Sequence, residues 1–278
     1  ADLAIKFTLR DARDRAGREY HTLQALAASG LDIAPRAVLL DRDRYAQPVV
    51  VQTWLAGECI SSPPATDADW QALVTHLAAA HTLTPANATC SLPAAVLAME
   101  SAAAGRQRIA EQGARLPLAE QPAELRDVIG RLERARFPGW PAPALALTRC
   151  DPNISNFVRR PDGWSSVDWE YSGWGDPAFD IADLLTHPAY QPLPAARREW
   201  IIARYSATRD DATIALRIRV YTCLMLVWWV ARFARLLYET PRGLDDRLAA
   251  RPADWQATFE AHLADYARAA SAALDDFR

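Results

Sequence analysis

The sequence lacks several features that mark common classes of protein. Its four cysteines lie far apart without a C-x-x-C pair, which excludes a zinc ribbon or a disulfide framework and predicts free thiols in a reducing compartment. The 31 Lys and Arg residues are scattered among 34 Asp and Glu, for a net charge of −3, so we expect no nucleic-acid partner. Residues 1–10 do not read as a signal peptide, and this favours a cytoplasmic enzyme.

Long hydrophobic runs are also missing. The longest, residues 220–231, lies between Arg219 and Arg232 and is well short of the roughly 20 residues that span a bilayer. It predicts a buried helix and no membrane partner. Half of the residues are hydrophobic and 23% are charged, a balance that suits one large globular domain or two lobes sharing a cleft.

The first part of the chain mixes extended and helical patterns. Apolar alternation predicts a strand over residues 3–9, and apolar residues at helical spacing predict a helix over 11–29, before Gly30. Further strands are predicted over residues 37–40 and 48–54. The pattern indicates a small mixed lobe, residues 1–57.

Beyond a Ser/Pro cluster at residues 61–64, the periodicity is mostly helical, which predicts a larger, mainly helical lobe over residues 58–278. The one strand-rich island in it covers residues 145–168. The fold class is therefore α+β with two lobes. The predicted helices cover residues 67–81, 94–112, 123–135, 177–186, 195–206, 211–239 and 252–277.

The island carries polar residues suited to phosphate chemistry. Asp151 and Asn156 lie five residues apart, and Asp168 follows twelve residues later, each beside an apolar strand. Together they supply one carboxylate for a proton and two oxygen ligands for a hard cation. Phosphoryl transfer asks for this combination, because the protein mainly positions groups and neutralises charge.

The motifs of the island resemble those of the aminoglycoside phosphotransferase and choline kinase family. Asp151 and Asn156 fit its catalytic loop H-x-D-x-x-x-x-N, Val167-Asp168-Trp169-Glu170 fits its metal segment [IV]-D-[FW]-E, and residues 175–182 fit the run G-D-P-x-x-D-[IL]-A. The resemblance implies a two-lobed protein-kinase-like fold. It also implies a kinase that moves the γ-phosphate of ATP or GTP to a hydroxyl or amine of a small molecule.

The resemblance further implies roles for individual residues. Asp151 would take the proton of the acceptor, while Asn156 and Asp168 would hold Mg²⁺. Lys6, paired with Glu19, would contact the phosphates. The linker that holds the nucleotide base would include Gln52, Thr53 and Trp54.

Two departures from the family pattern leave a second reading open. Arg149 stands where the family has His, and we expect it still to donate hydrogen bonds to the metal segment. Only five residues precede Lys6, too few for the hairpin and loop that cover the phosphates in the family. The sequence is then part of a longer reading frame, or the nucleotide site is incomplete, as in a pseudokinase that binds without transfer.

A protein kinase is disfavoured, because the interval from Asp168 to Asp176 is too short for an activation loop. Glu170, Asp176 and the C-terminal acids Asp265, Asp275 and Asp276 would suit a cationic acceptor, but charged surface helices have the same composition. The identity of the acceptor, the choice between ATP and GTP, and the oligomeric state do not follow from the sequence. Asp176 has two readings, a helix cap or a substrate contact.

Overall fold

The structure is a computed structural model that describes residues 2–244 and 251–278. The chain divides into two compact units. The first comprises Ala1–Ala98 and Ala142–Ile218, and the second comprises Met99–Pro141 and Arg219–Arg278. The predicted boundary at residue 57 falls inside the first unit and stays a prediction.

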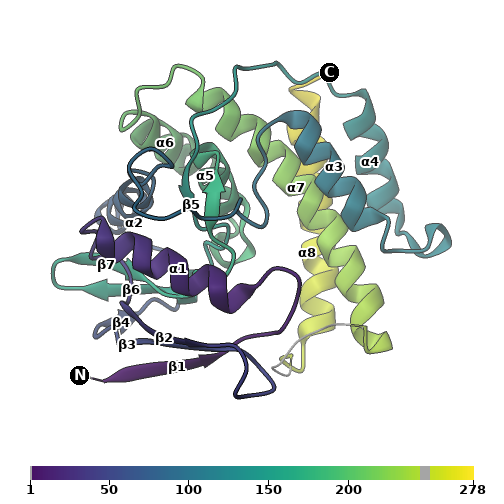
Figure 1. The fold of residues 1–278 in the computed structure, drawn as a ribbon. Helices are drawn as coiled ribbons and strands as arrows, with labels where there is room; N and C mark the ends of the chain where they lie inside the picture. Colours follow the sequence, from purple (N-terminus) through teal and green to yellow (C-terminus); the bar gives the residue numbers. More distant parts are fainter. Residues whose placement is uncertain (1, 245–250) are drawn as a thin grey trace. The chain divides into compact units, whose positions relative to one another are not determined.

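The first unit begins with a three-stranded antiparallel sheet. Strands β1 (Leu3–Phe7), β2 (Ala37–Asp41) and β3 (Val49–Thr53) pair in the order β1-β3-β2 (Figure 1). The alternation in β1 leaves Ile5 65% exposed, while Ala4 and Lys6 share the opposite face, as strand geometry requires. Lys6 is paired with Val50, and Ala4 with Gln52.

Helix α1 (Arg15–Ala28) packs against β2 and β3 through its buried residues, which include Leu23 and Leu26 (Figure 1). It begins four residues later than predicted, because the Asp14 carboxylate accepts a hydrogen bond from the Gly17 amide and caps the helix there. Gly30, at φ 72°, follows the helix in the left-handed conformation that glycine adopts without strain.

The rest of the first unit contains two more small sheets and several helices. Strands β4 (Glu58–Cys59), β6 (Phe157–Arg160) and β7 (Gly163–Ser166) form one antiparallel sheet, and β5 (Ala146–Thr148) pairs with β8 (Gly173–Gly175) in the other. The helices are α2 (Asp67–Ala80), α5 (Pro177–Thr186) and α6 (Ala195–Ser206). A buried cluster that includes Leu26, Ala80, Leu147 and Trp169 joins helix α1 to strand β5.

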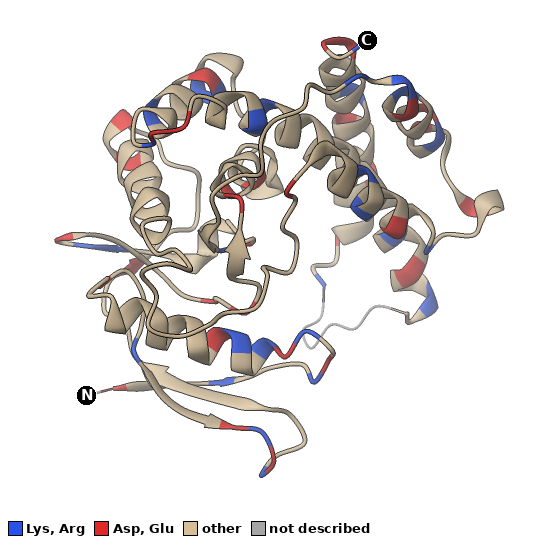
Figure 2. Ribbon diagram, turned by 45° about the horizontal axis from the view of Figure 1, so that its top comes forward, with Lys and Arg blue, Asp and Glu red and all other residues tan. Residues whose placement is uncertain are grey.

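The second unit contains helices α3 (Ala102–Gly113), α4 (Ala123–Arg134) and α8 (Trp255–Asp275), with most of α7 (Ile214–Glu239). Helices α4 and α8 pack together. By length and composition the helix from Ile214 to Arg242 could cross a membrane, but 72% of its most apolar window is buried inside the protein. This agrees with the predicted buried core helix. Charges of both signs are interspersed along the helices (Figure 2).

The helix predicted over residues 94–112 is wrong in its first part, since α3 begins at Ala102. The Ala95 amide donates to the carbonyl of Trp174, and the Trp174 amide donates to the carbonyl of Pro93, both at 2.9 Å. These bonds hold residues 93–95 as an extended bridge beside β8. A backbone that pairs with a segment so distant in the sequence is unavailable for the helical ladder.

Candidate active site

The loop between β5 and β6 carries Asp151 and is held by a buried carboxylate. Asp180, on helix α5, accepts hydrogen bonds from the amides of Arg149 at 2.6 Å and Cys150 at 2.9 Å. A ring nitrogen of buried His81 lies 3.1 Å from the same carboxylate. Cys150 has φ 56°, a left-handed conformation that a non-glycine residue keeps only when its surroundings hold it. Asp180 therefore fixes the shape of this loop.

Asp151 is paired with Asn156 inside the loop. Asn156 donates from its side-chain amide to Asp151 at 3.1 Å, and the backbone amide of Asn153 donates to the other carboxylate oxygen, also at 3.1 Å. Burial raises the pKa of Asp151 to about 6, with help from the charge of Asp168, while Arg149 and these hydrogen bonds oppose the rise. A carboxylate with such a pKa accepts a proton well near neutral pH.

Lys6 lies among three carboxylates. Its Nζ is 2.6 Å from Glu19, 2.5 Å from Asp168 and 3.3 Å from Glu170. Burial alone would lower the pKa of Lys6, but the attraction of the three acids outweighs it and raises the pKa above its usual value. Burial raises the pKa of Glu19. Within the described residues, Oε1 of Glu19 has no hydrogen-bond partner, so Lys6 is what compensates this buried acid.

Arg149 joins the loop of Asp151 to the segment of Asp168. Its buried guanidinium donates to the Asp151 carbonyl at 3.1 Å, to the Val167 carbonyl at 2.9 Å and to the Asp168 carbonyl at 3.1 Å. It also lies 4.6 Å from the centre of the Trp169 ring. Asp168 has φ 63°, a second left-handed residue. The expected hydrogen bonds of Arg149 to the segment of Asp168 are present. They hold the backbone of Asp168 in its left-handed conformation.

Carboxylates that could hold a hard cation lie on this segment and on α1. One ligand atom from each of Glu19, Asp168 and Glu170 can be chosen so that all three lie within 4.8 Å of one another. Asn156 is on the neighbouring strand end, where its carbonyl accepts a hydrogen bond from the Val167 amide at 2.9 Å. Carboxylate and amide oxygens are what Mg²⁺ prefers, so the residue types fit the predicted ion.

The predicted base-binding residues lie at the end of β3. Gln52 is 5% exposed, and among the described residues no donor reaches its Oε1. The Thr53 hydroxyl accepts from the Arg36 amide at 2.9 Å. Trp54 is 63% exposed. Within the described residues, the ion pairs of Lys6 join it to Glu19, Asp168 and Glu170.

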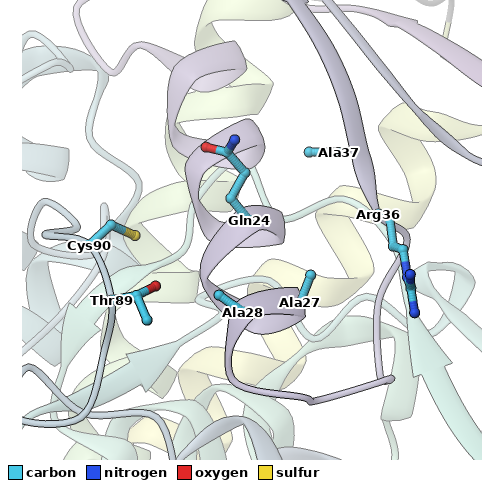
Figure 3. Close-up of a pocket in the computed structure, with 7 residues that line it drawn as sticks. All are labelled: Gln24, Ala27, Ala28, Arg36, Ala37, Thr89 and Cys90. Carbon is cyan, nitrogen blue, oxygen red and sulfur yellow. The ribbon is translucent and has the colours of Figure 1, made fainter.

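An open hollow of about 480 Å³ lies elsewhere, between α1, the start of β2 and the segment of Thr89 and Cys90. The side chains that line it are mostly small and uncharged, with Arg36 at its edge (Figure 3). None of the predicted site residues lies in this lining.

Asp176 is a helix cap. Its carboxylate accepts a hydrogen bond from the Ala178 amide at 3.0 Å. The Asp176 side chain is fully buried, and Nε of Arg217 lies 2.7 Å from its Oδ2. Arg217 also reaches Asp211 at 2.8 Å. The interpretation of Asp176 as a helix cap is confirmed, but no sequence signal marked Arg217 as its partner. Nor did one mark Arg15, whose Nη1 lies 2.5 Å from Glu170.

The fold is protein-kinase-like. A family model described as "Phosphotransferase enzyme family" matches residues 2–216. The chain belongs to this family of phosphotransferases, and its fold is also that of choline and ethanolamine kinases. No curated protein matches the sequence.

Several solved structures are similar in fold. A choline/ethanolamine kinase family protein from Mesorhizobium loti has 20% identity and a TM-score of 0.65, with 99% of this chain and 83% of that chain covered. Choline kinase LicA from Streptococcus pneumoniae has 16% identity and a TM-score of 0.64, covering 99% and 86%. A GDP and kanamycin complex of APH(2″)-IIia has 13% identity and a TM-score of 0.59, covering 96% and 93%. LicA is also known in complex with AMP.

Proposed function

We propose that this kinase transfers the γ-phosphate of a purine nucleoside triphosphate, ATP or GTP, to a hydroxyl or amine of a small cationic acceptor. The observation that carries the proposal is the connection of three segments. The Asp151 loop, the Asp168 segment and the Lys6 strand are joined by Arg149 and by the contact between Lys6 and Asp168. The complexes of similar proteins with AMP, GDP and kanamycin support a nucleotide and a polar acceptor.

Each residue has one task in this proposal. Asp151, with its raised pKa, orients the acceptor and takes its proton. Lys6 contacts the phosphates while Glu19 holds it, and Gln52, Thr53 and Trp54 line the place of the base. Asn156 and Asp168 would hold Mg²⁺, which when bound neutralises phosphate charge. Arg149 holds the Asp151 loop and the Asp168 segment in place relative to each other.

The test has two stages on the complete protein. Calorimetric titration with ATP and GTP, each with Mg²⁺, measures nucleotide binding. A phosphorylation screen of amines, sugars, amino alcohols and aminoglycosides then measures transfer. Binding with transfer to a cationic acceptor is the expected result. Binding without transfer to any acceptor would indicate a pseudokinase, and the absence of nucleotide binding would overturn the proposal.

A further inference from the structure

Glu170 lies between two cations at the phosphate site. Its Oε1 is 2.5 Å from Nη1 of Arg15, and its Oε2 is 3.3 Å from Nζ of Lys6. Both the Arg15 and the Glu170 side chains are 11% exposed. Water therefore screens this pair less than it screens a surface pair.

The carboxylates around Lys6 outnumber the cations, and Arg15 is the second cation of the group. Three carboxylates, those of Glu19, Asp168 and Glu170, share the single ammonium group of Lys6. Glu19 has no second cation among the contacts described, whereas Glu170 has Arg15. If Arg15 were neutral, the full charge of Glu170 would fall on Lys6. An ammonium group held more strongly by protein carboxylates is less available to phosphate oxygens.

Arg15 is itself fixed in place. It is the first residue of α1, its Nε lies 3.0 Å from Asp11, and its guanidinium lies 5.2 Å from the centre of the Tyr171 ring. Glu19 follows one helical turn later, so both residues lie on one face of α1. The start of α1 carries residues of both signs (Figure 2). One helix face thus holds Glu170 through Arg15 and Lys6 through Glu19.

We propose that Arg15 is a positioning residue of the phosphate site, which shares the charge of Glu170 with Lys6 and so leaves Lys6 available to the nucleotide. The proposal rests on the proposed nucleotide-binding function. It assigns Arg15 an electrostatic role, beyond tying α1 to the segment that follows Asp168.

The experiment is a charge-rescue cycle on the complete protein, with MgATP affinity measured by calorimetry. Arg15→Met should weaken binding about tenfold, the order expected for one unbalanced charge in a partly buried site. Glu170→Gln alters the site itself and is the reference for the cycle. Adding Arg15→Met to Glu170→Gln should weaken binding by less than about threefold, because the competing carboxylate is already gone. Arg15→Lys should keep most of the affinity.

Arg13→Met is the matched control. Arg13 also lies over the Tyr171 ring, at 5.5 Å, and pairs with Asp11 at 2.7 Å, but its contacts within the described residues do not include Glu170. It should bind MgATP like wild type, and circular dichroism would show that each variant is folded. If Arg15→Met does not fold by itself, the comparison of the folded double variant with Glu170→Gln still tests the idea.

Three results would overturn the assignment of Arg15. They are wild-type affinity in Arg15→Met, a further loss of about tenfold when Arg15→Met is added to Glu170→Gln, or loss of Mg²⁺-dependent binding in Glu170→Gln, which would make Glu170 a metal ligand. If the wild-type protein binds no nucleotide, the proposed function itself is overturned, and the assignment of Arg15 fails with it.

Discussion

The side-chain amide of Asn156 donates a hydrogen bond to the carboxylate of Asp151, with Nδ2 3.1 Å from Oδ2. The proposed proton acceptor and one proposed metal ligand are therefore in direct contact, on opposite ends of a six-residue loop. Their roles can nevertheless be separated by substitution, because only one of the two groups would face the acceptor.

Asp151→Asn should lower turnover by roughly 10² to 10⁴ fold, the range for a positioned general base. The substituted amide keeps an oxygen that can accept from Asn156, so the loop and the nucleotide affinity should change little. The checks are a single-turnover rate on an identified acceptor and a calorimetric titration with MgATP. Wild-type turnover in this variant would show that another group takes the proton.

Asp168→Ala and Asn156→Ala should weaken Mg²⁺-nucleotide binding and lower the rate together, by roughly 10 to 100 fold in affinity. The reason is that both oxygens are proposed to hold the ion that neutralises phosphate charge. Asp162→Ala, in the turn before β7 and with a side chain 68% exposed, is the control and should bind normally. Metal-dependent affinity that is unchanged in Asp168→Ala would contradict the metal assignment.

The pH profile should follow the pKa of Asp151, which burial raises to about 6. The carboxylate must be deprotonated to accept a proton, so kcat/KM for the nucleotide should fall about tenfold per pH unit below about pH 6. Arg149 opposes the raised pKa, so Arg149→Met should move this limb to higher pH. Arg149→Lys retains the charge and should leave the limb near its wild-type position. A limb that stays in place in Arg149→Met would argue against Asp151 as its source.

The buried ion pair of Arg217 and Asp176 should dominate the stability of the start of α5. Arg217→Met would leave the Asp176 charge without this partner and should cost roughly 3–5 kcal/mol of unfolding free energy. Chemical denaturation with urea measures this cost. Because an amide removes the unpaired charge, Asp176→Asn/Arg217→Met should recover part of the loss. Equal stability of the single and double variants would contradict the charge argument.

Asp211 gives the same region a pH dependence. Its hydrogen bond to Arg217 lowers the pKa of Asp211 to about 2, below the ordinary 3.8. A lowered folded-state pKa means that the contribution is complete above pH 3.8 and is lost as pH falls toward 2. Asp211→Asn should therefore melt at a lower temperature than wild type at pH 7, and the two proteins should converge near pH 2. A constant difference across this range would show that Asp211 acts by packing.

Local signals in the sequence predicted several elements well. Helix α5 begins at the predicted Pro177, because Asp176 caps it and proline suits the first helical position. Strand β8 was missed, since Gly173–Gly175 is too short and glycine-rich for apolar alternation to reveal. The extended bridge at residues 93–95 was missed for a related reason. Its partner is Trp174, and a sequence pattern does not show which distant backbone a segment will meet.

The sequence by itself determined the residue types and local spacings of the candidate site, namely Asp151 with Asn156 in one loop and Asp168 twelve residues further on. Loop spacing is a short-range property, so it can be read along the chain. Only the tertiary structure decided which charged side chains from distant parts of the sequence meet at the site. Lys6 and Asp168 are 162 residues apart, and an arginine that will be buried, such as Arg149 or Arg217, looks the same in sequence as one that stays in water. Burial and partner are set by packing, and packing gives these charges their energetic weight.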